Sequence, residues 1–161
     1  MDIMQWLTQT PAGEFCFTIL VSMIPVVELR GGIPFGVAQG LPVWTAFLAA
    51  VIGNMLPVPF IIVYIRRIFQ WMRRRLPGLN SLVDRLERKA HLKGRTVSKY
   101  KYLGLILFVA VPLPGTGAWT GSLVAAALNI RMRHALPAIA LGLVAAGLVT
   151  TALTLGVVHL L

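Results

Sequence analysis

Two long apolar runs without a charged residue constrain the fold of this chain more than any other feature. Residues 43–65 form one run of 23 residues, and residues 135–161 form another of 27. A helix of about 20 apolar residues is enough to cross the hydrocarbon core of a bilayer. Over the whole chain, 57% of the residues are hydrophobic and only 12% are charged. The sequence therefore predicts an all-α integral membrane protein with two full transmembrane helices.

Two other apolar segments, one before each long run, are broken near the middle. Residues 15–41 are interrupted by ELRGGIPFG at 28–36, and residues 102–130 by PLPGTGAWTG at 112–121. The apolar arms on either side have about a dozen residues, which is more typical of re-entrant segments than of full spans. Glycine and proline at the breaks free backbone groups that lipid cannot satisfy. We therefore expect each tip to be buried in protein or to line a wet cavity.

The distribution of basic residues predicts the topology. Residues 66–101 hold twelve of the fifteen Lys and Arg residues, whereas residues 1–14 hold none. If each broken segment enters and leaves the membrane on one side, then 66–101, Arg131 and Arg133 all face the cytoplasm and both termini face outward. This arrangement satisfies the positive-inside rule. It predicts an inverted repeat of a re-entrant hairpin plus a transmembrane helix, a design associated with secondary transporters.

The chain is then a single membrane domain, 1–161, made of a first repeat at 1–65, a basic cytoplasmic loop at 66–101 and a second repeat at 102–161. Apolar residues recur at helical spacing within 79–86, among many Lys and Arg residues. We expect an amphipathic helix there, lying on an anionic leaflet, and a shorter interfacial helix near residues 3–7.

Composition also excludes several kinds of site. The net charge of +10 accompanies a high hydropathy, so it indicates membrane orientation rather than nucleic-acid binding. Cys16 is the only cysteine, and no intrachain disulfide can form. No Cys, His and acid cluster has metal-ligand spacing, so we expect neither a metal nor another cofactor.

Glu28 and Arg30 are the only formal charges between residues 15 and 65. Each costs about 2.5–3.5 kcal/mol at the centre of a lipid-facing helix, so something must compensate them. Residues two apart diverge in a helix, but they share one face of an extended strand. Because Gly31 and Gly32 follow directly, we expect an unwound, buried tip where the acid and base line a polar cavity. The alternative is a structural ion pair that only locks the hairpin.

The second tip carries no charge, but hydroxyl groups such as that of Thr116 and backbone amides near Gly117 can receive an anionic group. Asn54, inside the first full span, is a further polar group available to the site. Alternatively, the glycines and prolines only form the turn, and Trp119 is a packing or interface aromatic. The predicted proton-coupling residue is Glu28. The predicted substrate-binding residues are Arg30, Gly31, Gly32, Pro34, Asn54, Pro112, Pro114, Gly115, Thr116, Gly117, Trp119 and Thr120.

Together, ELRGGIPFG at 28–36 and VAVPLPGTGAWTGSLVAAAL at 109–128 resemble the small multidrug export protein family, a small bacterial relative of the DedA superfamily. The resemblance implies a bacterial inner-membrane protein with two oppositely oriented re-entrant hairpins. It also implies transport linked to protons or membrane potential, with lipid-carrier phosphates such as polyprenyl phosphate as substrates in DedA-like relatives. The DedA pattern places basic residues in the second hairpin. This chain has none at 102–130, so Arg30 would be the main intramembrane anion ligand.

The expected function is a proton-coupled transporter or flippase for a lipid-linked phosphate or a small amphipathic substrate. Glu28 would load and release a proton while Arg30 and the tip amides hold an anionic headgroup. The alternatives are a proton-exchanging exporter of small cationic drugs and a membrane assembly factor without transport. We do not expect an enzyme, because Glu28 is the only acid at depth. Two full helices are few to cover two hairpins, so we expect a homodimer surrounded by membrane lipids.

Overall fold

The computed structural model describes residues 6–7, 10–75, 100–111 and 116–160. All regular structure in these ranges is helical, which confirms the predicted all-α class for them. The helices are α2 (Pro11–Ser22), α3 (Glu28–Ala38), α4 (Val43–Met55), α5 (Pro57–Arg75), α7 (Lys101–Ala110), α8 (Ala118–Ala127) and α9 (Met132–Leu160). The predictions for residues 3–5, 79–86 and 112–115 lie outside the described residues.

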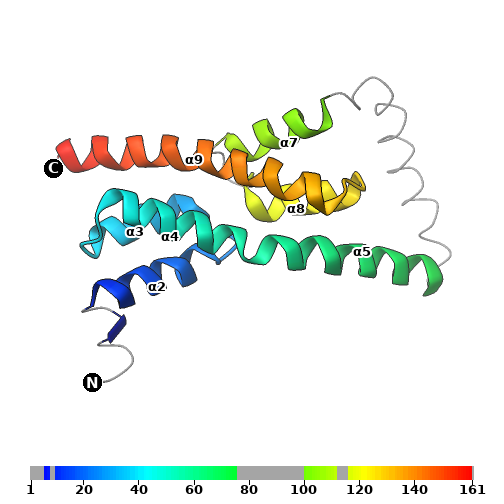
Figure 1. Ribbon diagram of the computed structural model, residues 1–161, viewed down its shortest axis with the longest axis horizontal. Helices are drawn as coiled ribbons and strands as arrows, with labels where there is room; N and C mark the ends of the chain where they lie inside the picture. The colour runs from blue at the N-terminus through cyan, green and yellow to red at the C-terminus, as the bar shows by residue number, and fades with distance from the viewer. Residues whose placement is uncertain (1–5, 8–9, 76–99, 112–115, 161) are drawn as a thin grey trace.

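Two stretches are long and apolar enough to cross a membrane, Val43–Ile65 and Met132–Val157. They confirm the two predicted spans. At about 1.5 Å per residue they measure roughly 34 and 39 Å, which exceeds the hydrocarbon thickness of about 30 Å. They run in opposite directions along the long axis of the molecule, with the first formed by α4 and α5 and the second by α9 (Figure 1).

The first span is interrupted at Leu56, between the end of α4 and the start of α5. Proline has no backbone N–H, so Pro57 and Pro59 cannot donate helical hydrogen bonds to the carbonyl groups of Gly53 and Met55. The interruption therefore follows directly from the two prolines. It leaves polar backbone groups inside an otherwise apolar helix.

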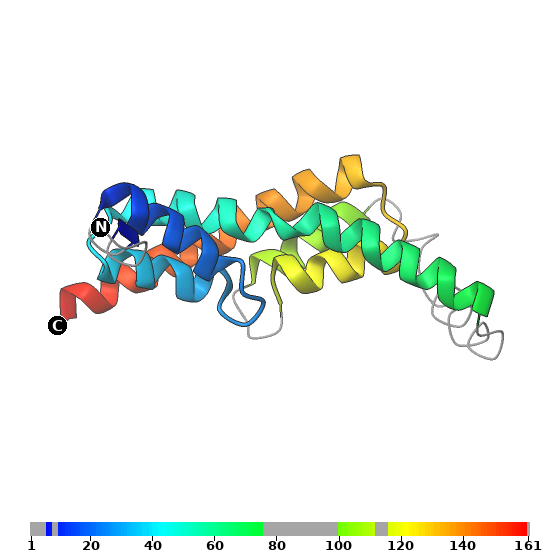
Figure 2. The same cartoon turned by 90° about the horizontal axis from the view of Figure 1, so that it is seen from below.

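Each broken apolar segment forms a helical hairpin, with α2 paired to α3 and α7 to α8. The four arms have 12, 11, 10 and 10 residues, too few for any one of them to cross a bilayer alone. The hairpins lie in opposite halves of the molecule, and the start of α3 meets the start of α8 near its middle (Figure 2). The α2–α3 hairpin packs on α4 and α9, and the α7–α8 hairpin packs on α5 and α9.

The position and form of the first tip differ from the prediction. The chain turns at residues 23–27, and ELRGGIPFG is helical from Glu28 onward rather than unwound. The expectation that Glu28 and Arg30 share one face of an extended stretch was therefore wrong. In a membrane a helix satisfies the backbone within one segment, and this outweighs the low helix propensity of glycine. The small Gly32 also lets Ser22 of α2 approach closely.

Glycines at matching positions hold both hairpins against their spans. Gly53 lies against the backbone of α2, and Gly142 lies against the backbone of α7, so a Cβ at either position would overlap it. Gly32 and Gly121 likewise bring α3 and α8 close to the first helix of their own hairpin. The same number of residues separates Gly53 from Gly142 and Gly32 from Gly121. These two glycine contacts therefore recur in both halves of the chain.

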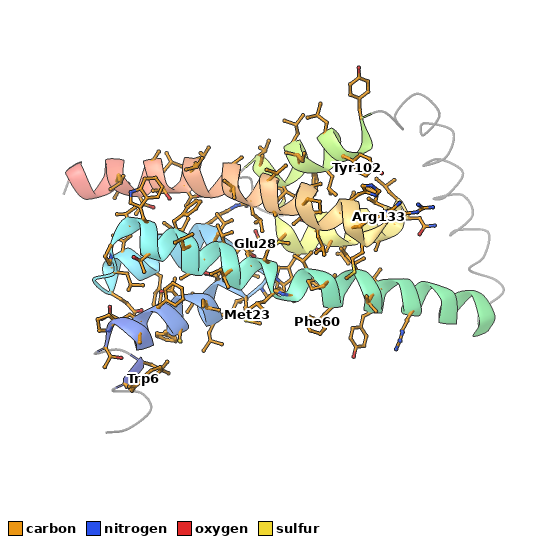
Figure 3. All side chains as sticks on the ribbon, viewed as in Figure 1. Trp6, Met23, Glu28, Phe60, Tyr102 and Arg133 are labelled. Carbon is orange, nitrogen blue, oxygen red and sulfur yellow. The ribbon has the colours of Figure 1, made fainter. Side chains whose placement is uncertain are left out.

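The ends of the molecule differ in charge. Trp6 and the C-terminal end of α9 lie at one end, and Tyr102, Arg133 and the C-terminal end of α5 lie at the other (Figures 1 and 3). Arg131 and Arg133 are exposed at the start of α9, and the last turns of α5 contain further arginines. Both groups of basic residues are therefore at the same end, as the positive-inside argument requires.

Candidate functional site

Glu28 lies near the middle of the molecule, where the two hairpins meet (Figure 3). It is the first residue of α3, is only 6% exposed, and has a left-handed φ of 50°. Its carboxylate lies against Gly117, which precedes α8 and has a φ of 146°. The backbone N–H of Trp119 donates a hydrogen bond to this carboxylate.

Through this contact the Glu28 side chain caps the N-terminus of α8, a helix of the other hairpin. Gly117 stands at the N-cap position of α8 and has no side chain to accept hydrogen bonds from the first turn. Capping side chains normally accept from the second or third residue of the helix, and Trp119 is the second residue of α8. A negative charge at this end is also favoured by the helix dipole. A Cβ at Gly117 would overlap both carboxylate oxygens, so this approach requires glycine.

Arg30 makes the complementary contact at the end of α7. Its Nη2 donates hydrogen bonds to the carbonyl oxygen of Thr116 at 2.5 Å and to Thr116 Oγ1 at 3.0 Å. A longer contact of 3.4 Å reaches the carbonyl oxygen of Val111, the C-cap residue of α7. Thr116 Oγ1 itself donates to the Val111 carbonyl at 2.7 Å. A cation thus lies at the helix end that favours positive charge.

These contacts compensate two charges that stand in an otherwise apolar stretch of sequence. Each charge costs about 2.5–3.5 kcal/mol at the centre of a lipid-facing helix. A charged hydrogen bond contributes about 1.5–3 kcal/mol, and a favourable helix end contributes up to about 2 kcal/mol when partly buried. For each residue, one such hydrogen bond and one favourable helix end together contribute about as much as the charge costs. Glu28 and Arg30 also lie close enough to interact electrostatically. Through Glu28 at the start of α8 and Arg30 at the end of α7, the first hairpin contacts both helices of the second.

The other predicted residues are distributed around this junction. Gly31 and Gly32 face Val27 and Ser22 and serve close packing in the first hairpin. Thr120 donates a long hydrogen bond of 3.4 Å to the carbonyl of Gly117, within its own helix. Pro112, Pro114 and Gly115 lie outside the described residues.

Asn54 is the most unusual polar residue of the core. It is fully buried near the end of α4, and neither its Oδ1 nor its Nδ2 has a hydrogen-bond partner among the described residues. It lies two residues before the interruption at Leu56. A buried amide without partners is costly, by about 1–3 kcal/mol, which is unusual for a purely structural position.

A cavity of about 370 Å³ opens beside the junction, on the side of the interrupted span. Its walls are apolar and include Met23 of the first tip, Leu56 and Pro57 at the interruption, and the side chain of Trp119. Trp119, predicted as a site residue or a packing aromatic, therefore contributes its backbone to the cap of α8 and its ring to this cavity.

A larger groove of about 580 Å³ lies between α3 and the C-terminal half of α9. It is lined by Arg30, Pro34, Val37, Ala38, Thr150, Leu153, Thr154 and Val157. Arg30 and Pro34 were predicted as site residues, whereas the α9 wall was not. Its signal in the sequence is Thr150 and Thr154, spaced four apart in an otherwise apolar span.

The family model described as "Putative small multi-drug export protein" matches residues 28–149 of the chain, from Glu28 into the second half of α9. The match begins at the acid of the junction and includes every residue of the second tip. No curated protein and no solved structure matches the chain.

Proposed function

The chain belongs to the small multidrug export protein family, and on this premise we propose that it is a secondary transporter of the bacterial inner membrane. In this proposal the two hairpins are re-entrant and belong to an inverted repeat, with the tips meeting near the bilayer midplane. The opposed hairpins and the matching glycine contacts support the repeat. The basic residues at one end support a cytoplasmic position for that end and periplasmic termini. Substrate sites at the repeat interface are a feature of such transporters.

One observation carries the proposal: the tips are held together by an ionisable acid. Alternating access requires one hairpin to move against the other. Such movement must break the contact between the Glu28 carboxylate and the N-terminus of α8. Protonation removes the negative charge that favours this helix end, and the contact weakens. A proton on Glu28 therefore releases the tips, and its loss closes them again. This makes Glu28 the proton-coupling residue of the proposed cycle.

The proposed substrate is a lipid-linked phosphate or a small amphipathic anion, since Arg30 places a cation at the junction. Kinship with the DedA superfamily, whose relatives handle polyprenyl phosphate, is part of this proposal. The family description favours a second candidate, a proton-exchanging exporter of small cationic drugs, which would use Glu28 as the cation's partner. A membrane assembly factor without transport is the third candidate. No enzymatic step is proposed.

We also propose a homodimer. Val26, in the turn of the first hairpin, is 91% exposed, and Ile24 is 47% exposed. This turn lies near mid-length of the molecule, where its irregular backbone would face hydrocarbon (Figure 2). Irregular backbone at membrane depth is tolerated only when protein or a water-filled cavity covers it. A second copy of the chain, embedded with it in membrane lipids, supplies that cover.

The three candidate functions predict different compounds whose addition causes proton movement across the membrane. Proteoliposomes loaded with a pH-sensitive dye would be challenged with dodecyl phosphate or with ethidium, with protein-free liposomes as the control. The proposal expects protein-dependent proton movement with dodecyl phosphate. Proton movement with ethidium alone would support the drug exporter instead, and no movement with either compound in correctly folded protein would favour the assembly factor.

A further inference from the structure

The groove between α3 and α9 has a polar inner end and apolar walls. Arg30, which also contacts the second tip, lies on α3 at the end nearest the middle of the molecule. Val37 and Ala38 lie about two turns further along α3, toward the end where α9 terminates (Figure 1). Leu153 and Val157 form the facing wall. The groove therefore runs from the junction toward one end of the molecule.

The two threonines of the groove add little polarity. The hydroxyl of Thr150 donates to the carbonyl of Ala146 at 2.9 Å, and that of Thr154 donates to the carbonyl of Thr150 at 2.9 Å. Their hydrogens are used within the helix, so they cannot donate to a ligand at the same time. Arg30 is the only charged residue among those that line the groove. Glu28 is not one of them, because its carboxylate faces Gly117.

The dimensions suit a small amphiphile. A volume of about 580 Å³ falls within the usual range of small-molecule sites, about 300–1,000 Å³. From Thr150 to Val157 the α9 wall extends for about 10 Å at 1.5 Å per residue. This is enough to cover a substantial part of an alkyl chain. A lipophilic cation would place its charge beside Arg30 and be repelled.

We propose that this groove binds a single-chain anionic amphiphile, with its phosphate or carboxylate headgroup at Arg30 and its chain between Val37, Leu153 and Val157. The inference rests on the proposed transport function and deepens it by naming the substrate class and the residues of α9 that hold the chain. It also assigns the two ends of the site different tasks. Arg30 selects the sign of the charge, and the apolar walls select for a chain.

The test is equilibrium binding of radiolabelled dodecyl phosphate to the full chain in nanodiscs of zwitterionic lipid, with empty nanodiscs as background. Leu153→Trp fills the groove from a residue that is 63% exposed, so the fold should tolerate it. Leu148→Trp is the matched control, because Leu148 lies on the same helix but does not line the groove. We expect Leu153→Trp to weaken binding by about tenfold or more, whereas Leu148→Trp changes it by less than about twofold.

Two further ligands separate headgroup from chain. Unlabelled dodecyl phosphate should displace the label, whereas inorganic phosphate and dodecyltrimethylammonium should not at the same concentration. Equal displacement by inorganic phosphate would show a headgroup site without a chain site. Better displacement by the cation, or equal effects of the two tryptophan variants, would also overturn the inference.

This experiment is independent of the transport cycle. It uses no pH gradient, so it measures binding to the groove without any proton-driven flux. If the protein carries out proton-driven flux but does not bind dodecyl phosphate in the groove, the groove proposal is wrong and the transporter proposal stands. If the protein binds dodecyl phosphate in the groove but moves no protons, the proposal of a proton-coupled transporter is wrong instead.

Discussion

Glu28 and Arg30 show what single residues of this chain reveal and what they conceal. Their position in apolar sequence predicts that they are buried and compensated, and the structure confirms the burial of Glu28. Their main partners are the ends of α8 and α7, which lie more than 80 residues away along the chain. Local sequence patterns carry no information about such distant partners. For this reason the acid and base were expected to face one another across an extended tip.

Gly117 gives the sharpest test at the residue scale. Gly117→Ala adds a Cβ that overlaps the Glu28 carboxylate and disfavours the φ of 146°. Alanine at positive φ destabilises by more than about 1 kcal/mol, so the melting temperature should fall. Gly104→Ala is the control, because Gly104 lies in α7 with open space around it and should gain about 0.5–1 kcal/mol of helix stability. Wild-type stability of Gly117→Ala would contradict the Glu28 cap.

At the scale of elements, the sequence predicts the spans and the hairpin arms well and the exact turns poorly. Apolar run lengths identified α4 with α5, α9 and the four short arms. The Gly31–Gly32 pair indicated an unwound tip, but both glycines are helical, and Gly32 packs against α2. The actual turn at 23–27 contains Pro25 but no glycine, so it gives a weak turn signal. The α3–α9 groove depends on tertiary packing and was not predictable.

The interruption between α4 and α5 supplies a prediction of its own. Asn54→Leu replaces a fully buried amide without partners among the described residues, so the free energy of unfolding should stay equal or rise by about 1–3 kcal/mol. Proton movement with dodecyl phosphate should fall, because the amide at the interruption is kept for function rather than stability. Thermal melting and the liposome assay measure the two effects.

Ser122→Ala is the comparison for Asn54→Leu. Ser122 is equally buried, but its hydroxyl donates to the carbonyl of Ala118 at 2.6 Å. Its removal should cost about 0.5–1.5 kcal/mol and leave transport unchanged. A large loss of stability in Asn54→Leu would mean that the amide has structural partners after all.

For the whole molecule, charge distribution predicted that the basic groups of both halves lie at one end, and the structure places Arg133 at the same end as the C-terminal end of α5. Run lengths and charge rules act over the whole chain, so they survive errors in single turns. They say nothing about what covers the exposed first turn. The homodimer was expected because two helices are few to cover two hairpins, but the proposed interface at this turn rests on its exposure at mid-length.

The dimer can be tested by cross-linking in native membranes. Val26→Cys on a Cys16→Ala background should form a covalent dimer with a short bifunctional maleimide, because the turn lies in the proposed interface. Leu148→Cys on the same background is an exposed control on α9. If Val26→Cys cross-links no better than Leu148→Cys, the first turn is not covered by a second copy.

The central claim is that Glu28 couples protons to movement of the tips, and proton-driven flux in Glu28→Gln protein tests it most directly. The variant keeps the shape of the side chain but cannot gain or lose a proton. Glu14→Gln, which changes the other acid in the described residues, is the control. With dodecyl phosphate and an imposed pH gradient, we predict wild-type flux in Glu14→Gln and none in folded Glu28→Gln. Full proton-driven flux in Glu28→Gln would contradict the account.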